Sequence, residues 1–387
     1  MSAQNAYIQY SLDDYFQSTP IGSIDRAIGN SLYGMNHQQI PAMVSSNWDL
    51  YGFTFFTRPQ LNLQSDNVRN IRQFYPLLTG NPASMQRFVR TTLDPRLIIG
   101  YNVPINVGGS TYSVPPISCP VTDNTMAFMS VLTNNLNSIS GWPDITAPTF
   151  TSKSGLYNQA FSHVDGTSRS YETFDIDATF RNTRGDTILY LFYVWLWYQS
   201  MVFEGYMVPY LDFIAENEID YNTRIYRLVL DQTRTYVKKI AATIAFPISV
   251  PMSAFFDFNK EKPYNDQNAD FTIRFRCNGV NYMDDIIVYE FNKAVGIFNP
   301  NMTDQYRTNT MVKIDKSLLN IFNNRGYPYI DENTYELQWW VDQDLFTNRV
   351  SAFLQTGALP SNTSYSQTNG AVTSGGAPFT DYNPGTT

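Results

Sequence analysis

Side chains that could carry catalytic chemistry are scarce in this sequence. Its 387 residues include only two histidines, His37 and His163, and two cysteines, Cys119 and Cys277. A hydrolytic triad needs a histidine beside a nucleophile, but His37 lies in a polar stretch and His163 lies in an expected strand. None of the motifs GxSxG, HExxH, GxxxxGKS/T or GxGxxG occurs. We therefore expect no enzymatic activity.

The two cysteines also argue against a disulfide framework or a zinc site. They are far apart, and no CxxC spacing occurs. Cys277 alternates with Phe275 and Ile273, whereas Arg274 and Arg276 fall on the other face of the same expected strand. We interpret Cys277 as a small core residue, place synthesis in a reducing cytoplasm, and expect no cofactor or metal.

Carboxylates gather after the most apolar segment, at Glu204, Asp212, Glu216, Glu218 and Asp220. A glycosidase needs two carboxyl groups about 5–10 Å apart, and a calcium loop usually alternates acidic residues as DxDxDG, which is absent. We interpret the cluster as solvated loop carboxylates or partners for Arg224 and Arg227. A hydrolase with a carboxylate pair remains an alternative.

The composition indicates a surface that is covered by other subunits. Only 16% of the residues are charged, whereas 26 are Phe and 27 are Tyr. Soluble domains usually carry about 25% charged residues, and interface cores are depleted of charge and enriched in aromatic residues. The alternative is a monomer with a large aromatic core.

The charge balance argues against a protein whose main function is to bind nucleic acid. The net charge is −8, and no run of basic residues is longer than Lys238-Lys239. An acidic surface is compatible with a conduit through which DNA passes without sequence-specific contact.

The elements that must position these side chains follow from periodicity. Residues 48–59 alternate as a strand, and 66–75, 81–93 and 123–139 have helical patterns. Further strands are expected at 157–164, 171–180, 223–230, 239–250, 270–277 and 285–291, and helices return over 304–354. The apolar segment 188–203 predicts a buried helix, with Asp186 at its N-cap and Gly205 at its C-cap.

That apolar helix is shorter than the roughly 20 residues that cross a bilayer, so we expect no membrane insertion. The polar N-terminus lacks the features of a signal peptide.

Together these elements predict an α+β fold, mainly an antiparallel β-sandwich or rolled sheet with one aromatic helix packed on it. We expect five regions: an extended arm over 1–50, a mostly helical region over 51–145, a β-rich domain over 150–300, a helical region over 301–356 and a low-complexity tail over 357–387. Aromatic residues in the last two regions are the candidate interaction residues, namely Trp339, Trp340, Tyr365, Phe379 and Tyr382.

Two parts of the chain resemble a known class of proteins. The segment Phe53–Leu63, which reads FTFFTRPQLNL, and the blocks Asn217–Arg224, Ala245–Pro247 and Phe291–Pro300 resemble virion structural proteins of large tailed bacteriophages with contractile tails. The order of elements over 157–300 is similar to the fold of tail-tube subunits, tube-initiating baseplate proteins and tail terminators.

This resemblance implies a non-enzymatic virion component that is made in the host cytoplasm. It implies a ring of identical copies at the neck or baseplate, in contact with tube, sheath, baseplate or neck subunits and with DNA passing non-specifically. Two alternatives remain: a carbohydrate- or receptor-binding module of the virion, and a capsid-associated structural protein.

Overall fold

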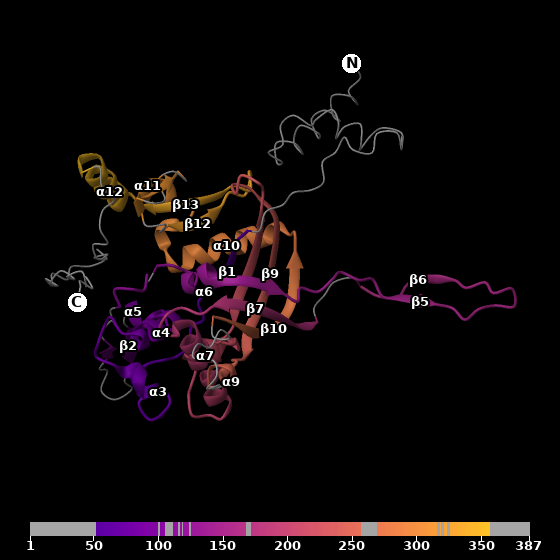
Figure 1. Cartoon of the computed structure of the whole chain (residues 1–387), viewed down its shortest axis with the longest axis horizontal. Helices are drawn as coiled ribbons and strands as arrows, with labels where there is room; N and C mark the ends of the chain where they lie inside the picture. Colours follow the sequence, from indigo (N-terminus) through magenta and orange to yellow (C-terminus); the bar gives the residue numbers. More distant parts are fainter. Residues whose placement is uncertain are drawn as a thin grey trace, which may run out of the picture.

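A computed structural model shows how the chain folds (Figure 1). It describes residues 52–99, 101–104, 111–114, 117, 119–123, 125–167, 172–256, 269–315, 318, 321–322 and 326–356. The expected N-terminal arm and C-terminal tail lie outside the described residues, and the division into five regions stays a prediction.

A six-stranded antiparallel sheet forms the centre of the fold, in the order β1-β8-β9-β10-β7-β4. The strands are β1 (Thr54–Phe56), β8 (Thr223–Leu230), β9 (Val237–Ser249), β10 (Asp270–Tyr282), β7 (Thr173–Arg181) and β4 (Leu136–Ser140). The predicted rolled antiparallel sheet is therefore confirmed, and the strands expected at 171–180, 223–230, 239–250 and 270–277 are all present. The strand expected over 48–59 is confirmed at β1.

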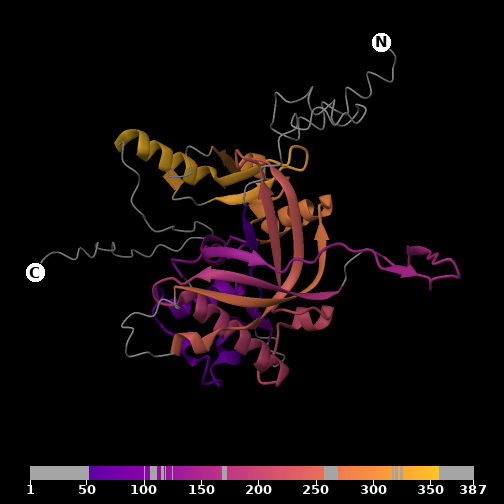
Figure 2. The same cartoon turned by 45° about the vertical axis from the view of Figure 1, so that its right-hand side comes forward.

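The sheet curls because its long strands are interrupted by β-bulges. The pairing of β9 with β10 shifts register twice, between Arg274 and Phe275 and between Asn278 and Val280. Gly279 lies within the second shift with φ of 67°, a conformation that glycine adopts without a steric cost. Figure 2 shows β9 and β10 bending along their length. The curl gives the sheet a concave and a convex side.

One face of the sheet is covered by α7 (Thr187–Phe203), the predicted apolar helix. Trp195, Tyr198 and Phe192 on this helix are fully buried. The helix ends in a Schellman motif, in which the amide of Gly205 donates to the carbonyl of Val202 and that of Tyr206 donates to Met201. The predicted start and end are thus confirmed, although Asp186 caps without a side-chain hydrogen bond.

Short helices flank α7 on the same side: α3 (Ser65–Val68), η1 (Tyr75–Leu78), α4 (Met85–Leu93) and α5 (Arg96–Ile99). They occupy the stretches 66–75 and 81–93 that were expected to be helical. The helix expected over 123–139 is wrong beyond α6 (Ser130–Asn135), because the chain continues as β4. Leu136 and Ile139 are half-buried there and β4 pairs with β7, so sheet pairing outweighs the weak helical pattern.

The opposite face, over β8 and β9, is covered by α10 (Asp285–Phe298) and a second sheet. The strand expected at 285–291 is wrong. Ile287, Val288, Phe291 and Val295 are buried at helical spacing, and the Asp284 side chain accepts a hydrogen bond from the Ile286 amide at the helix start.

The second sheet replaces part of the helical region expected over 304–354. Its strands β11 (Met311–Ile314), β13 (Leu337–Asp342) and β12 (Tyr327–Ile330) pair in that order. The α-helices among the described residues of this stretch are α11 (Arg307–Thr310) and α12 (Gln343–Thr356), and the short 3-10 helix η3 (Pro300–Met302) precedes it. The apolar residues of β11 and β13 lie on paired strands instead of a helical stripe, since cross-strand contacts decide their conformation.

Consecutive phenylalanines in β1 show how the sheet separates two cores. Phe56 belongs to the core under α7, where its ring lies 5.9 Å from that of Phe275. Phe55 belongs to the core under α10, where its ring lies 5.3 Å from that of Phe291. Cys277 is fully buried in the first core, as predicted.

The remaining elements are peripheral. They are the hairpin β2 (Tyr101–Pro104) with β3 (Thr111–Val114), the hairpin β5 (Thr149–Thr151) with β6 (Ser162–Val164), α8 (Leu211–Glu216) and α9 (Met252–Phe256). The strand expected over 157–164 is shorter in the structure, because only its last three residues pair as β6. No helix in the described chain combines the length and the apolar character that a bilayer span requires.

Candidate assembly surfaces

The segment FTFFTRPQLNL, which carries part of the resemblance, is mostly buried, although Phe53 at its start is exposed. Arg58 is buried and donates to the carbonyls of Thr92 at 3.1 Å, Thr91 at 2.5 Å and Met126 at 3.3 Å. Burial lowers the pKa of Arg58 to about 10. This guanidinium therefore ties β1 to the end of α4 and to the loop before α6.

A buried carboxyl lies close to this segment. Asp94 accepts hydrogen bonds from the Leu63 amide at 2.9 Å and from the Tyr210 hydroxyl at 2.8 Å. Burial raises the pKa of Asp94 to about 7, against the opposing effect of these hydrogen bonds. The Tyr198 hydroxyl donates to Asp220, and burial also raises the pKa of Asp220. The contact of Asp94 with Tyr210 joins the end of α4 to the start of α8, and the contact of Tyr198 with Asp220 ties α7 to the loop before β8.

The β5–β6 hairpin projects from the fold without a partner among the described residues. Every residue of both strands is exposed, and both views show the hairpin extending away from the rest of the fold (Figures 1 and 2). Its large side chains are nevertheless apolar: Leu156 is 92% exposed, Tyr157 81% and Phe161 71%. Exposed apolar side chains of this kind mark interaction sites in soluble proteins.

A second group of exposed apolar side chains occurs from the end of α7 to α8. Its members, which we call the α7–α8 surface, are Phe203, Tyr206, Val208, Leu211 and Ile214. Phe203 is 92% exposed and Leu211 is 80% exposed. Leu211 and Ile214 are three residues apart on α8 and so share one face. Phe213 and Asp212 turn the other way, toward Arg96, whose guanidinium lies 5.2 Å from the Phe213 ring.

The predicted acidic cluster surrounds this surface. Asp212 pairs with Arg96 at 2.6 Å, and Asp220 is buried beside Tyr198. The partnership expected with Arg224 is wrong, since Arg224 pairs with Glu290 of α10 at 2.6 Å.

Where α10 does not reach, the outer face of the main sheet is polar and charge-balanced. Arg274 on β10 pairs with Asp177 on β7 at 2.8 Å, and Arg276 donates to Asp175 at 3.2 Å. Beside them, the hydroxyls of Thr179 and Thr272 lie 2.9 Å apart. We call these three cross-strand pairs the β7–β10 ladder.

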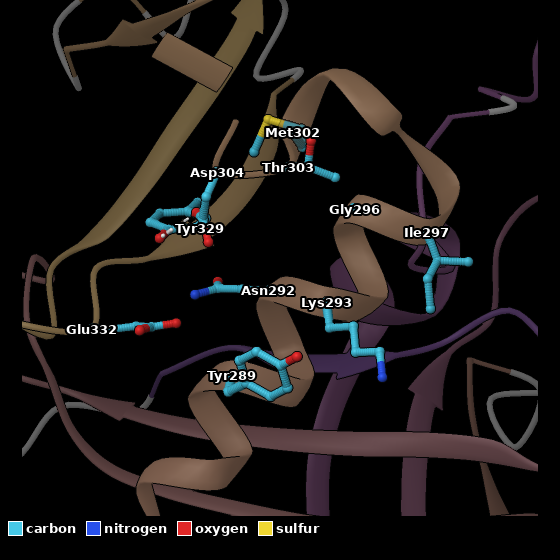
Figure 3. A pocket seen from close by; sticks show the side chains of 10 residues that line it. All are labelled: Tyr289, Asn292, Lys293, Gly296, Ile297, Met302, Thr303, Asp304, Tyr329 and Glu332. Carbon is cyan, nitrogen blue, oxygen red and sulfur yellow. Dashed lines mark hydrogen bonds between the residues drawn. The ribbon is translucent and has the colours of Figure 1, made fainter. Parts of the chain in front are cut away.

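A pocket of about 290 Å³ lies between α10 and β12 (Figure 3). Its walls combine both charge signs, with Lys293, Asp304 and Glu332, and Figure 3 shows Tyr329 and Asp304 side by side. The Tyr329 hydroxyl donates to Asp304 at 3.2 Å, and the Arg307 guanidinium stacks 3.4 Å from the Tyr329 ring. These contacts tie β12 to α11 and to the loop that precedes α11.

The structure places two of the predicted interaction residues and not the others. Trp339 is half-buried, with its ring 6.0 Å from Phe53. Trp340 is also half-buried and donates its indole N–H to Gln338 at 3.1 Å. Tyr365, Phe379 and Tyr382 lie outside the described residues. Their role as interaction residues stays a prediction.

Sequence reasoning missed the hairpin and the α7–α8 surface. The hairpin begins at the expected boundary between the regions 51–145 and 150–300, where no strand was predicted before residue 157. The signal that could have revealed the hairpin is the large apolar side chains set among small polar ones, such as Phe150, Leu156 and Phe161. His163, considered for catalysis, lies in this hairpin with its ring 5.4 Å from that of Phe150.

The described groups do not assemble the triad considered from sequence. Cys277 is buried in the core, and desolvation raises the pKa of its thiol to about 12. The thiolate is therefore disfavoured at neutral pH.

The chain matches the model of a known family and is similar to a solved structure. A family model described as "Putative phage tail tube protein" matches residues 10–356. A solved structure, the anti-feeding prophage cap or AFP tube terminating cap, is similar at 15% identity and a TM-score of 0.24, over 38% of this chain and 79% of that one. No curated protein matches the chain in sequence.

Proposed function

Because the chain belongs to this family of phage tail tube proteins, we propose that it is a non-enzymatic tail subunit that assembles with its own copies into a ring. The observation that carries the proposal is the exposed β5–β6 hairpin, whose apolar side chains find no cover within the described fold. Burial of such side chains at an interface is favourable.

In this ring the β7–β10 ladder faces the channel. Its arginines are paired with carboxylates of the neighbouring strand, which reduces their attraction for the phosphates of passing DNA. The other face of the same strands carries the core under α7, so the ladder is the side of β7 and β10 that remains free for a lumen.

The ring stands at one end of the tube, at the neck or at the baseplate. Two additions to the sheet and its helix support this position: the helical region that contains α3 to α6, and the C-terminal sheet β11–β13. An end ring contacts tube subunits on one side and a different kind of neighbour on the other, and these additions supply extra surface for the second contact.

Imaging tests both parts of the proposal, the ring and its position at one end of the tube. Negative-stain micrographs of the purified full-length chain should show rings, and gold-labelled antibodies should bind intact particles at one end of the tail. Label spread along the whole tail would contradict the end position, and label on the capsid alone would contradict a tail subunit.

A further inference from the structure

We propose that the β5–β6 hairpin of one copy docks on the α7–α8 surface of a second copy, so that neighbouring subunits join through two different surfaces. This inference rests on the proposed function, because it specifies how the copies of the ring meet. It is carried by the side chains and charges of the two surfaces.

The first argument is that the hairpin cannot serve its own subunit. An extended strand advances about 3.3 Å per residue, so the arm from Gly141 to its tip at Leu156 reaches up to roughly 50 Å. A compact domain of about 300 residues has a radius of gyration of about 19 Å, so this reach is comparable with the width of a whole subunit. In both views the arm leads away from α7. Its apolar tip is therefore available to a neighbour.

The second argument is complementarity of side chains. The hairpin offers Leu156, Tyr157 and Phe161, all more than two-thirds exposed. The α7–α8 surface offers Phe203, Leu211 and Ile214 on a helix end and a helix face. Leucine and aromatic side chains on both sides suit a small apolar interface centre with a polar rim.

The third argument is complementarity of charge. Residues 203–219 contain Glu204, Asp212, Glu216 and Glu218 and no lysine or arginine. Residues 149–164 contain Lys153 and no acidic residue. Lys153 and Glu216 are both exposed, so an approach of the hairpin to this surface brings opposite charges to the rim.

A contact between two different surfaces also explains how the ring closes. A contact between two different surfaces is heterologous, and such contacts generate rings when the rotation between neighbours closes. Each copy then gives one hairpin and receives one, which leaves no hairpin uncovered in the assembly.

Cysteine cross-linking between copies tests the docking directly. Two full-length variants are prepared, Leu156→Cys in one and Leu211→Cys in the other, and mixed under mild oxidation. The native cysteines Cys119 and Cys277 are both buried. Docking holds the new thiols of neighbouring copies close together, so a mixed disulfide dimer should dominate. A matched control replaces Leu211→Cys by Val121→Cys, at an exposed site outside both surfaces, and should give little product.

The outcomes separate this inference from the proposed function. Rings that form without the Leu156–Leu211 cross-link, or with cross-links only between two hairpin tips, overturn the docking and leave the ring intact. A chain that stays monomeric overturns both. As a second readout, Lys153→Glu should weaken assembly, and adding Glu216→Lys should restore part of it. A double variant no better than Lys153→Glu alone would contradict the charge pairing.

Discussion

Arg58 illustrates how one buried side chain fixes several segments at the residue scale. Its guanidinium reaches backbone carbonyls before α6 and at the end of α4, and it lies 5.8 Å from the ring of Phe298. The planar group serves several acceptors at once, which a lysine ammonium on a flexible chain cannot reproduce. The role of Arg58 is thus to hold β1 in place.

Replacing Arg58→Lys should therefore destabilise the protein. Carbonyls that lose their donor stay buried, so we expect the free energy of unfolding to fall by about 1–3 kcal/mol. Urea unfolding measures this. The matched control is Arg69→Lys, at an exposed arginine that lies 3.6 Å from Asp66, where a change within about 0.5 kcal/mol is expected. Equal stability of the two variants would contradict the role given to Arg58.

Asp94 predicts a pH dependence of stability. Its folded pKa of about 7 lies above the unfolded value of 3.8. The folded state thus binds more protons between these values, and this group lowers the free energy of unfolding as the pH rises through that window. The substitution Asp94→Asn should remove this contribution to the pH dependence of the free energy of unfolding.

Urea unfolding of wild type and Asp94→Asn at about pH 5 and pH 8 measures the effect. The advantage of the wild type over the variant should shrink by about 2–3 kcal/mol between the two pH values, at about 1.4 kcal/mol per pH unit up to the folded pKa. Asp66→Asn, at an exposed carboxylate, serves as the control. An advantage that stays constant or grows with pH would refute the assignment.

At the scale of elements, the strand β4 depends on the glycine that follows it. Gly141 has φ of 100°, and a Cβ there would lie 2.4 Å from the Asp175 carbonyl oxygen of β7. Gly141→Ala should therefore loosen the edge of the sheet at the base of the hairpin arm.

We expect Gly141→Ala to lower the free energy of unfolding by about 1–3 kcal/mol. Hydrogen exchange should show faster exchange of the amides of β4 and β7. Gly80→Ala, at a glycine with open space around it, should be close to neutral. Unchanged protection in β4 would show that the edge tolerates a side chain there.

Elements with long, regular patterns could be predicted from the sequence. The alternation over Thr173–Arg181 and the unbroken apolar run of α7 each point to one conformation. The region after Asp284 was predicted as a strand and is a helix, because Ile287, Val288 and Phe291 fit a short strand as well as a helix. Likewise, Trp339 lies in a strand because β13 pairs with β11 on one side and β12 on the other. A single sequence does not reveal those distant pairing partners.

The assembly surfaces were harder to foresee than the fold. The scarcity of charge indicated that surface is covered by other subunits, but not which surface. The hairpin and the α7–α8 surface become visible only when burial in the folded chain shows which apolar side chains, such as Leu156 and Phe203, remain outside the core.

At the scale of the whole molecule, the charge balance of the β7–β10 ladder predicts how a channel treats DNA. Asp175→Asn with Asp177→Asn leaves Arg274 and Arg276 without their carboxylate partners. Assembled particles of this double variant should retain DNA at low salt and release it steeply as salt rises.

Retention of labelled DNA by assembled particles measures this effect, with wild type and Arg274→Gln plus Arg276→Gln as the comparisons. Wild-type particles and particles of the arginine variant should both retain little DNA. DNA binding that is the same in all three would show that the ladder does not face the DNA.

The central claim is that this chain works by joining its own copies, and its mass in solution tests that claim most directly. Light scattering of the purified full-length chain over a concentration series should show one discrete species at a fixed multiple of 44.3 kDa, which Leu156→Ser with Tyr157→Ser converts to monomer. A mass that stays at 44.3 kDa at every concentration would contradict the account.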